Sequence, residues 1–260
     1  MPDLTNKTDF CGAMVPAISP QGHTLGVVIV KATYEIDSQG TLSLAVEQSD
    51  ILYADEMADD GRAIRVPSDF VDRKPGAEVI VVPPVRTVRD SLYANQQLAV
   101  RFGTLVFAGK IEDKWPFGPI GRLEEPRRTY AGTYDDAWQR ERMPLLPLDF
   151  DARYHLAAPA GQLLGAYARG DEELALANFY GERRIEARLP GAAVVVSTNV
   201  LGDYFTRIAD LDTIIIWSDV ARLQLVWRLA IRPRQKLEEI GDVFVDAVDL
   251  RAARELFSAT

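Results

Sequence analysis

Apolar and polar residues alternate along much of this chain, and the period of the alternation is two. In residues 28–36 the even positions are apolar, whereas the odd positions after Ile29 hold Lys31, Thr33 and Glu35. A period of two is typical of a β-strand that buries one side and exposes the other to solvent. The same pattern recurs in residues 223–231, where Gln224 and Arg228 take the polar side. We therefore predict two long strands, each with one buried and one solvated face.

Shorter strands are expected where apolar runs lie between Pro and Gly residues. They are predicted at residues 78–82, 98–107, 185–189, 193–198 and 213–217. Residues 37–40, which end in Gly40, predict a turn that leads into a partner strand at residues 41–44, because glycine accepts positive φ. This density of short strands favours antiparallel sheets over repeated βαβ units. We predict a mainly β fold of antiparallel sheets, in a sandwich or barrel-like arrangement, with few short helices.

Helical spacing is clearest at the C-terminal end of the sequence. Asp249 is suited to the N-cap position, and one stripe of the following residues is formed by Leu250, Ala253, Leu256 and Phe257. These features predict a C-terminal amphipathic helix. Residues 160–177 are interrupted by Gly165 and Gly170 and are expected to form turns and strands.

The most distinctive segment is TYAGTYDDAWQRERMPLLPLDFDARYHLAAPAGQ at residues 129–162. Thr133 is placed to cap a helix, and Asp135 and Asp136 stand where the helix dipole favours carboxylates. Pro144 and Pro147 limit this helix to two or three turns, because each removes a backbone donor. The segment is therefore predicted to be a short helix followed by an extended passage.

This segment and three other blocks resemble a family long catalogued as a domain of unknown function, whose members lie in bacterial type VI secretion gene clusters. The other blocks are KATYEID at residues 31–37, SDFVDRKPGAEVIVV at residues 68–82 and LDTIIIWSDVARLQLVWR at residues 211–228. Between Gly109 and Tyr130 the chain is shorter than the family pattern. The resemblance implies a non-catalytic adaptor or chaperone that binds a toxic effector or a PAAR-like spike-tip protein and loads the effector onto the secreted spike. It implies no cofactor.

The composition is that of an ordinary globular protein. With 260 residues, of which 47% are hydrophobic and 26% charged, the chain can bury a substantial core. We predict a single β-rich domain over residues 1–260; the alternative is two lobes that meet near the Pro-rich residues 115–126. The formal net charge of −9 argues against nucleic acid as a partner, because phosphate contacts need clustered Lys and Arg. An acidic chain suits a basic protein partner, and it equally suits solubility alone.

The cysteine content indicates a reducing compartment. Cys11 is the single cysteine, so it has no partner for an internal disulfide, and it lies in a terminal segment expected to be mobile. Residues 1–16 have neither a basic start nor a continuous apolar stretch, so we expect neither a signal peptide nor a transmembrane helix. We expect a cytoplasmic protein with no membrane partner and no metal.

Residues for catalysis are sparse in the sequence. His23 and His155 are the two histidines, no G-x-S-x-G elbow occurs, and His155 is expected to be a structural residue on a strand. Carboxylates lie close together at Asp59 and Asp60, Asp135 and Asp136, and Asp149 and Asp151. A β-sandwich enzyme that cleaves carbohydrates or esters is the main alternative to the adaptor, and it requires a cleft that gathers two acids or a serine with His155. A third hypothesis is that the protein is a structural component that carries no cargo.

Aromatic residues amid Pro and charge suggest where a partner binds. Trp and Arg are residue types that dominate binding energy at interfaces, and Pro residues make regular strands unfavourable in residues 115–138. We predict a partner-binding surface formed by Trp115, Phe117, Arg127, Arg128, Tyr130, Tyr134 and Trp138.

Overall fold

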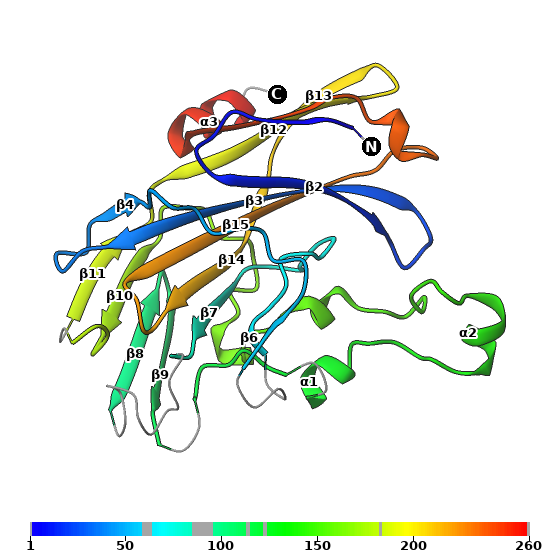
Figure 1. Ribbon diagram of the computed structural model, residues 1–260. Coiled ribbons are helices and arrows are strands. Elements are labelled where there is room, and N and C mark those ends of the chain that lie inside the picture. The colour runs from blue at the N-terminus through cyan, green and yellow to red at the C-terminus, as the bar shows by residue number, and fades with distance from the viewer. Residues whose placement is uncertain are drawn as a thin grey trace.

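The protein is built from open β-sheets with a few short helices (Figure 1). The computed structural model describes residues 2–58, 64–84, 96–112, 115–121, 124–181 and 184–258. The predicted mainly β fold, its antiparallel sheets and its C-terminal helix are confirmed. Two pairs of neighbouring strands are parallel, and the other named pairs are antiparallel.

The central sheet contains the two long strands predicted from alternation. Its strand order is β2 (Cys11–Ile18), β3 (Thr24–Ile36), β15 (Arg222–Ile231), β14 (Asp210–Trp217) and β7 (Glu78–Val82), and β4 (Leu42–Leu44) pairs with the end of β3. The hairpin between β3 and β4 is therefore confirmed. Cys11 lies in β2, so the expectation that it belongs to a mobile terminus is wrong.

Two four-stranded sheets accompany the central sheet. One has the order β1 (Leu4–Asn6), β16 (Val243–Asp249), β12 (Ala192–Val200) and β13 (Asp203–Ile208); the other has the order β11 (Arg184–Arg188), β10 (Glu173–Ala177), β8 (Gln97–Phe102) and β9 (Leu105–Lys110). The single strand predicted at residues 98–107 is a hairpin, because Gly103 adopts a φ of 56° and reverses the chain. A short ribbon pairs β5 (Glu56–Met57) with β6 (Ile64–Val66).

The three larger sheets share one hydrophobic core. One face of the central sheet supplies Val28, Val30, Leu225 and Ile214, and both four-stranded sheets pack against it through residues such as Val196, Val245, Leu98 and Leu176. The sheets remain open at their edges and stack in layers, as in a sandwich. Figure 1 shows the two four-stranded sheets at opposite ends of the central one.

The other face of the central sheet is the main departure from the predicted pattern. Lys31, Thr33, Gln224 and Arg228 were expected to face water, but all four are buried. Loops cover this face, and the buried polar groups are paired with partners from those loops. Burial of charged groups is stable only when they are paired and hydrogen-bonded, so alternation alone does not distinguish a solvated face from a satisfied one.

The helices are short. They are α1 (Glu125–Arg128), α2 (Asp136–Glu141), α3 (Leu250–Ser258) and the 3-10 turns η2 (Ala152–His155), η3 (Ala160–Gln162) and η4 (Leu237–Glu239). Asp249 caps α3 as predicted, since its Oδ1 accepts from the Arg251 N–H at 2.8 Å. Residues 160–177 form η3, turns and β10, as expected, whereas His155 ends a 3-10 turn rather than lying on a strand. Within the described residues, none of the helices combines the length and apolar character needed to cross a membrane.

Gly40 allows the β3–β4 hairpin to pack against β11. Its φ is 83°, and a Cβ at this position would lie 1.8 Å from the Glu186 carbonyl oxygen. Gly40→Ala should lower the free energy of unfolding by about 3 kcal/mol, through left-handed strain and the clash with backbone. Gly191 is a matched control, because its φ is 70° and a Cβ there meets no atom within 4 Å. Urea unfolding should show a loss of only about 1 kcal/mol for Gly191→Ala, and equal losses in the two variants would contradict the close packing.

Candidate functional site

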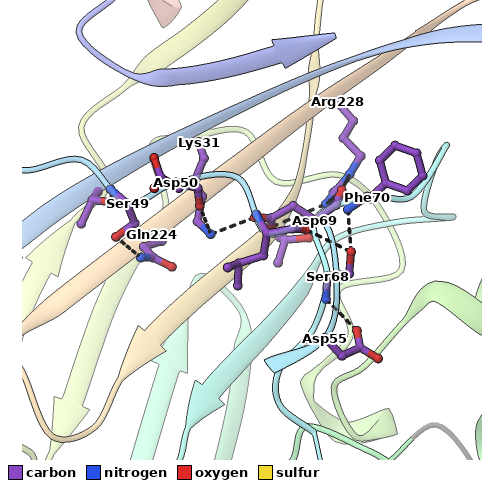
Figure 2. A network of polar contacts seen from close by, with 12 residues as sticks. Lys31, Ser49, Asp50, Asp55, Ser68, Asp69, Phe70, Gln224 and Arg228 are labelled. Carbon is purple, nitrogen blue, oxygen red and sulfur yellow. Dashed lines mark hydrogen bonds and ion pairs between the residues drawn. The ribbon is translucent and has the colours of Figure 1, made fainter. Parts of the chain in front are cut away.

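A chain of buried ion pairs crosses the second face of the central sheet (Figure 2). It begins on β3, where the Lys31 Nζ donates to the Asp69 carboxylate at 2.8 Å. That carboxylate also accepts from the Leu52 N–H at 3.0 Å. The Arg228 guanidinium on β15 donates to the Asp69 carbonyl oxygen through Nε at 3.1 Å and Nη2 at 3.0 Å. Asp69 therefore fixes its loop to two strands of the sheet.

The chain of charges continues across β14 to β7. Arg228 pairs with Asp212, whose Oδ1 accepts from the Thr213 hydroxyl at 2.7 Å. The same hydroxyl accepts from the Lys74 Nζ at 2.7 Å, and Lys74 also pairs with Glu78 at 2.5 Å. The second oxygen of the Glu78 carboxylate accepts two backbone N–H groups, from Ala157 and Ala158, each at 2.7 Å.

This charge network is electrically balanced. It comprises the cations Lys31, Arg228 and Lys74 and the anions Asp69, Asp212 and Glu78, and each of these residues is at most 2% exposed. Isolated charges at such depth would cost several kcal/mol each, and pairing with additional hydrogen bonds offsets that cost. The network thus holds the loops around Asp69 and Lys74, and the segment at residues 157–158, against the sheet.

Two neighbouring cavities open beside the network. The larger, of about 480 Å³, lies between the turn at Arg73–Pro75 and residues 149–152, with Tyr167 on its wall. The smaller, of about 270 Å³, has Asp212 and Arg228 of the network in its lining, together with Asp72, Arg207 and Asp210. Both cavities contain Arg73, Lys74 and Tyr167, so they form one charged cleft.

The carboxylates of the cleft differ in the direction in which their pKa values are shifted. Hydrogen bonds from the Thr133 backbone and hydroxyl lower the pKa of Asp149, and the hydrogen bond from the Arg153 side chain lowers the pKa of Asp151. Partial burial and the nearby Asp212 raise the pKa of Asp210. The larger cavity therefore has two ionised carboxylates at neutral pH.

Asp72 joins the cleft to His155. The two side chains are 3.4 Å apart. Burial raises the pKa of Asp72, but contacts with His155 and Arg73 together leave the pKa below its usual value. The His155 ring also lies 5.3 Å from Phe150, between centroids. His155 thus has a carboxylate and an aromatic neighbour in the wall beside the cleft.

Beside the cleft, residues 124–156 form an extended arm that carries α1, α2 and η2 (Figure 1). Asp135, not Thr133, caps α2, since its side chain accepts from the Trp138 N–H at 2.8 Å. Thr133 instead donates to Asp149 through its N–H and its hydroxyl, at 3.0 and 2.7 Å. These contacts hold the outgoing and returning segments of the arm together at its base.

The tip of the arm is fastened to the hairpin between β2 and β3. The Arg142 Nη2 donates to the Pro20 carbonyl oxygen and, at 3.0 Å, to the Leu146 carbonyl oxygen. The Trp138 Nε1 donates to the Leu145 carbonyl oxygen at 2.8 Å. The arm is therefore supported at its tip as well as at its base.

Large apolar side chains of the arm face solvent. Tyr134 is 52% exposed, Met143 63% and Leu148 64%. The Tyr134 ring packs edge-on against Trp138, with centroids 4.7 Å apart. A rigid arm with exposed aromatic and aliphatic groups is a feature of protein contact surfaces.

The structure divides the seven predicted partner-binding residues into two groups. Five lie on the arm, namely Arg127, Arg128, Tyr130, Tyr134 and Trp138. Among these, Arg127 is buried, with its Nε donating to the Tyr154 carbonyl oxygen at 2.9 Å, whereas Arg128 and Tyr134 are exposed. Tyr130 is half-buried under the Arg153 guanidinium, 4.2 Å from the ring centroid.

Trp115 and Phe117 form the second group, and the predicted surface position of Phe117 is wrong, as is that of Arg127, because both side chains are buried. Phe117 is 2% exposed and belongs to the main core, where it contacts Phe107 and Trp115. Trp115 is half-buried, and its Nε1 donates to the Val81 carbonyl oxygen at 2.8 Å. An irregular Pro-containing segment can fill a core when its polar groups find partners, so the absence of a regular strand did not imply exposure.

Several residues of the site had no signal in the sequence. Asp69, Lys74, Asp212 and Tyr167 reach their partners in the site through contacts between segments that are distant in the sequence. Among the carboxylate pairs, Asp59 and Asp60 lie outside the described residues.

The chain belongs to a bacterial protein family. The family described as "Uncharacterized protein conserved in bacteria (DUF2169)" matches residues 21–105 and 111–228. The matched residues include all six charged members of the network and the whole arm. No curated protein and no solved structure matches the chain.

Removal of one network partner should be far more damaging than removal of a surface ion-pair partner. Asp69→Ala removes the counter-ion of Lys31, which keeps only the Asp50 carbonyl oxygen as an acceptor at 3.2 Å, and leaves the Leu52 N–H unpaired. We expect a loss of about 3–5 kcal/mol in the free energy of unfolding. The control is Glu173→Ala, which removes the pair with Arg101 at 2.8 Å on the surface, where Glu173 is 64% exposed. That change should cost about 0–1 kcal/mol. Urea unfolding measures both, and a loss below about 1 kcal/mol for Asp69→Ala would contradict the proposed importance of the network.

Proposed function

We propose that this protein is a non-catalytic adaptor or chaperone that binds a type VI secretion effector or a PAAR-like spike-tip protein in the cytoplasm and loads the effector onto the spike. The secretion system and the cargo come from the resemblance of the four sequence blocks. The observation that carries a partner-binding role is the arm, which presents Tyr134, Met143 and Leu148 to solvent.

The arm is suited to binding because it is already ordered. Asp149 holds its base through Thr133, and Arg142 holds its tip through Pro20. Binding then immobilises few additional groups on this side of the interface, which leaves more of the contact energy for affinity. Aromatic side chains such as Tyr134 and Trp138 are the residue types that contribute most at interfaces.

The cleft at the base of the arm supplies polar recognition. Asp149 and Asp151 are ionised at neutral pH and are exposed enough to accept hydrogen bonds from a polypeptide. A carbohydrate-active enzyme instead needs one carboxyl group with a raised pKa to act as general acid. The pKa values of Asp149 and Asp151 are both lowered, so these two residues do not form such a pair, whereas the pKa of Asp210 in the same cleft is raised.

Co-expression with the effectors and PAAR-like proteins encoded by neighbouring genes tests the proposal. At least one of them should form a stable complex with this protein and should gain soluble yield, because an adaptor covers apolar surface of its cargo. Deletion of the gene should reduce secretion of that effector. If no candidate co-purifies and neither yield nor secretion changes, the adaptor function is wrong.

Tyr134→Ala should separate binding from folding. Tyr134 is half-exposed on the arm, so its loss should leave the melting temperature nearly unchanged while it weakens binding to the co-purified partner by about 2 kcal/mol, as for a typical interface anchor. The control is Tyr204→Ala on β13, where the side chain is 83% exposed and far along the chain from the arm. Calorimetric titration of both variants measures the effect. Equal affinity of the Tyr134→Ala and Tyr204→Ala variants for the partner would show that Tyr134 of the arm does not contribute to the contact surface.

A further inference from the structure

Both edge strands of the central sheet carry features that oppose pairing with a further strand. An edge strand has unpaired main-chain N–H and C=O groups, and proteins usually cover or interrupt such a strand. At the β7 edge, the Gln162 Nε2 donates to the Val79 carbonyl oxygen at 2.6 Å, and the Trp115 Nε1 donates to the Val81 carbonyl oxygen at 2.8 Å. At the β2 edge, Pro16 is exposed and has no N–H to donate.

The four-stranded sheets are protected at their edges as well, with the exception of β13. The β1 edge has only three residues. The turn at Gly40 packs against the Glu186 main chain of β11, and a Cβ added to Gly109 of β9 would lie 2.5 Å from the Pro116 side chain. In contrast, β13 has six residues, contains no Pro and pairs with β12 in an unbroken register. Within the described residues, no further strand follows β13 in its sheet.

Every second residue of β13 directs its main-chain groups away from β12. The Ala209 N–H, directly after β13, donates to the Val194 carbonyl oxygen of β12 at 2.8 Å. Alternate residues of an antiparallel strand face the same neighbour, so every second residue before Ala209 also pairs with β12. The hydroxyls of Ser197 and Thr206 lie 2.9 Å apart, which fits an opposite pair that shares no main-chain hydrogen bond. The outward main-chain groups are therefore those of Tyr204, Thr206 and Ile208.

The outward residues leave this edge accessible. Tyr204 is 83% exposed, Thr206 is also exposed, and Ile208 is half-buried. Figure 1 shows the β12–β13 hairpin at the upper margin of the molecule. Tyr, Thr and Ile are residue types that favour strands, so β13 keeps the extended conformation that pairing requires.

The sequence of β13 is complementary to itself in one antiparallel register. If Thr206 lies opposite Thr206 of a second copy, Tyr204 lies opposite Ile208 and Phe205 lies opposite Arg207. Each outward residue then exchanges both main-chain hydrogen bonds with its opposite residue. Thr–Thr and aromatic–β-branched pairs stabilise antiparallel sheets. Arg207 lies 5.3 Å from the Phe205 ring centroid of its own chain, so its guanidinium already has a partner.

The neighbouring registers are less favourable. A register centred on Phe205 places Ile208 opposite Gly202 in the β12–β13 turn, so Ile208 has no strand residue opposite it. A register centred on Arg207 places two guanidinium groups opposite each other, which is destabilising. The register centred on Thr206 is therefore the one that pairs all the outward residues and brings no like charges together.

We propose that β13 is the interface of a homodimer, in which it pairs antiparallel with β13 of a second copy around a two-fold axis at Thr206. The pairing joins two four-stranded sheets into one continuous sheet, and the two-fold axis closes the assembly at two chains. Only one strand of each copy takes part, so the dimer is weak and its population depends on protein concentration. The inference goes beyond the adaptor function, because the outward residues of β13 belong to neither the arm nor the cleft.

Sedimentation velocity of the full chain over a range of concentrations measures the dimer. The sedimenting mass should rise from that of one chain, 28.9 kDa, toward twice that value. Thr206→Lys places two ammonium groups opposite each other at the axis and should raise the dissociation constant about tenfold or more. Thr206→Val also lacks the hydroxyl but adds no charge, and it should dimerise as the unchanged protein does. Thr5→Lys adds the same charge on exposed β1, at the other end of the sheet, and should have no effect.

Disulfide cross-linking tests the register. In the double variant Cys11→Ser/Thr206→Cys, the two Cα atoms at the axis should lie about 5.5 Å apart, within the range of a disulfide, so oxidation should link two chains. The control is Cys11→Ser/Asp203→Cys. In the proposed register the two Asp203 positions are about 20 Å apart along the strands and should not link.

Three results would overturn the inference. One is a constant mass of a single chain up to millimolar concentration. Another is a dimer that persists in Thr206→Lys while its melting temperature matches that of Thr206→Val, because the chains then associate through another surface. The third is a cross-link at position 203 without one at position 206. If Thr206→Lys does not fold, the cross-linking pair decides the question.

None of these results bears on the adaptor function, whose failure shows in the co-expression experiment.

Discussion

The structure depends on the pairing of charges on a buried sheet face. One side of the central sheet is an ordinary apolar core, but the other side carries Lys31, Arg228 and Glu78 from three strands. Each of these groups needs a counter-charge, since an unpaired ion in the interior costs several kcal/mol. Asp69 and Lys74 come from a loop. If this loop left the sheet, Lys31 and Glu78 would lose their counter-charges.

The charge network also determines the walls of the cleft. Lys74, Arg228 and Asp212 form part of its lining, and Tyr167 donates to the Lys74 carbonyl oxygen at 2.7 Å. Arg73 stands next to Lys74 and is exposed in both cavities. The exposed Arg73 of the cleft is therefore adjacent in sequence to Lys74 of the buried network. The buried residues therefore fix the backbone position of this exposed neighbour.

The sequence predicted the strands and helices better than the contacts between polar side chains. Alternation found β3 and β15, short apolar runs found β7 and β14, and Asp249 marked the start of α3. No sequence pattern predicted β1, β2, β5, β6, β13 or β16. Lys31 and Asp69 are separated by 38 residues, and Lys74 and Thr213 by 139, so no local pattern shows that these polar residues satisfy one another. For the same reason, alternation described a solvated face where the fold has a buried one, and Pro-rich composition placed Phe117 on the surface although it fills the core.

Strand β3 connects the arm to the loop that contains Asp69. It begins at Thr24, after the hairpin whose Pro20 supports the arm through Arg142, and Lys31 in its middle holds the loop that carries Phe70. The arm and the Asp69 loop are therefore attached to β3 or to the turn that precedes it, through contacts between described residues. Because a sheet strand moves only with its neighbours, β3 fixes the position of the arm tip relative to the charge network.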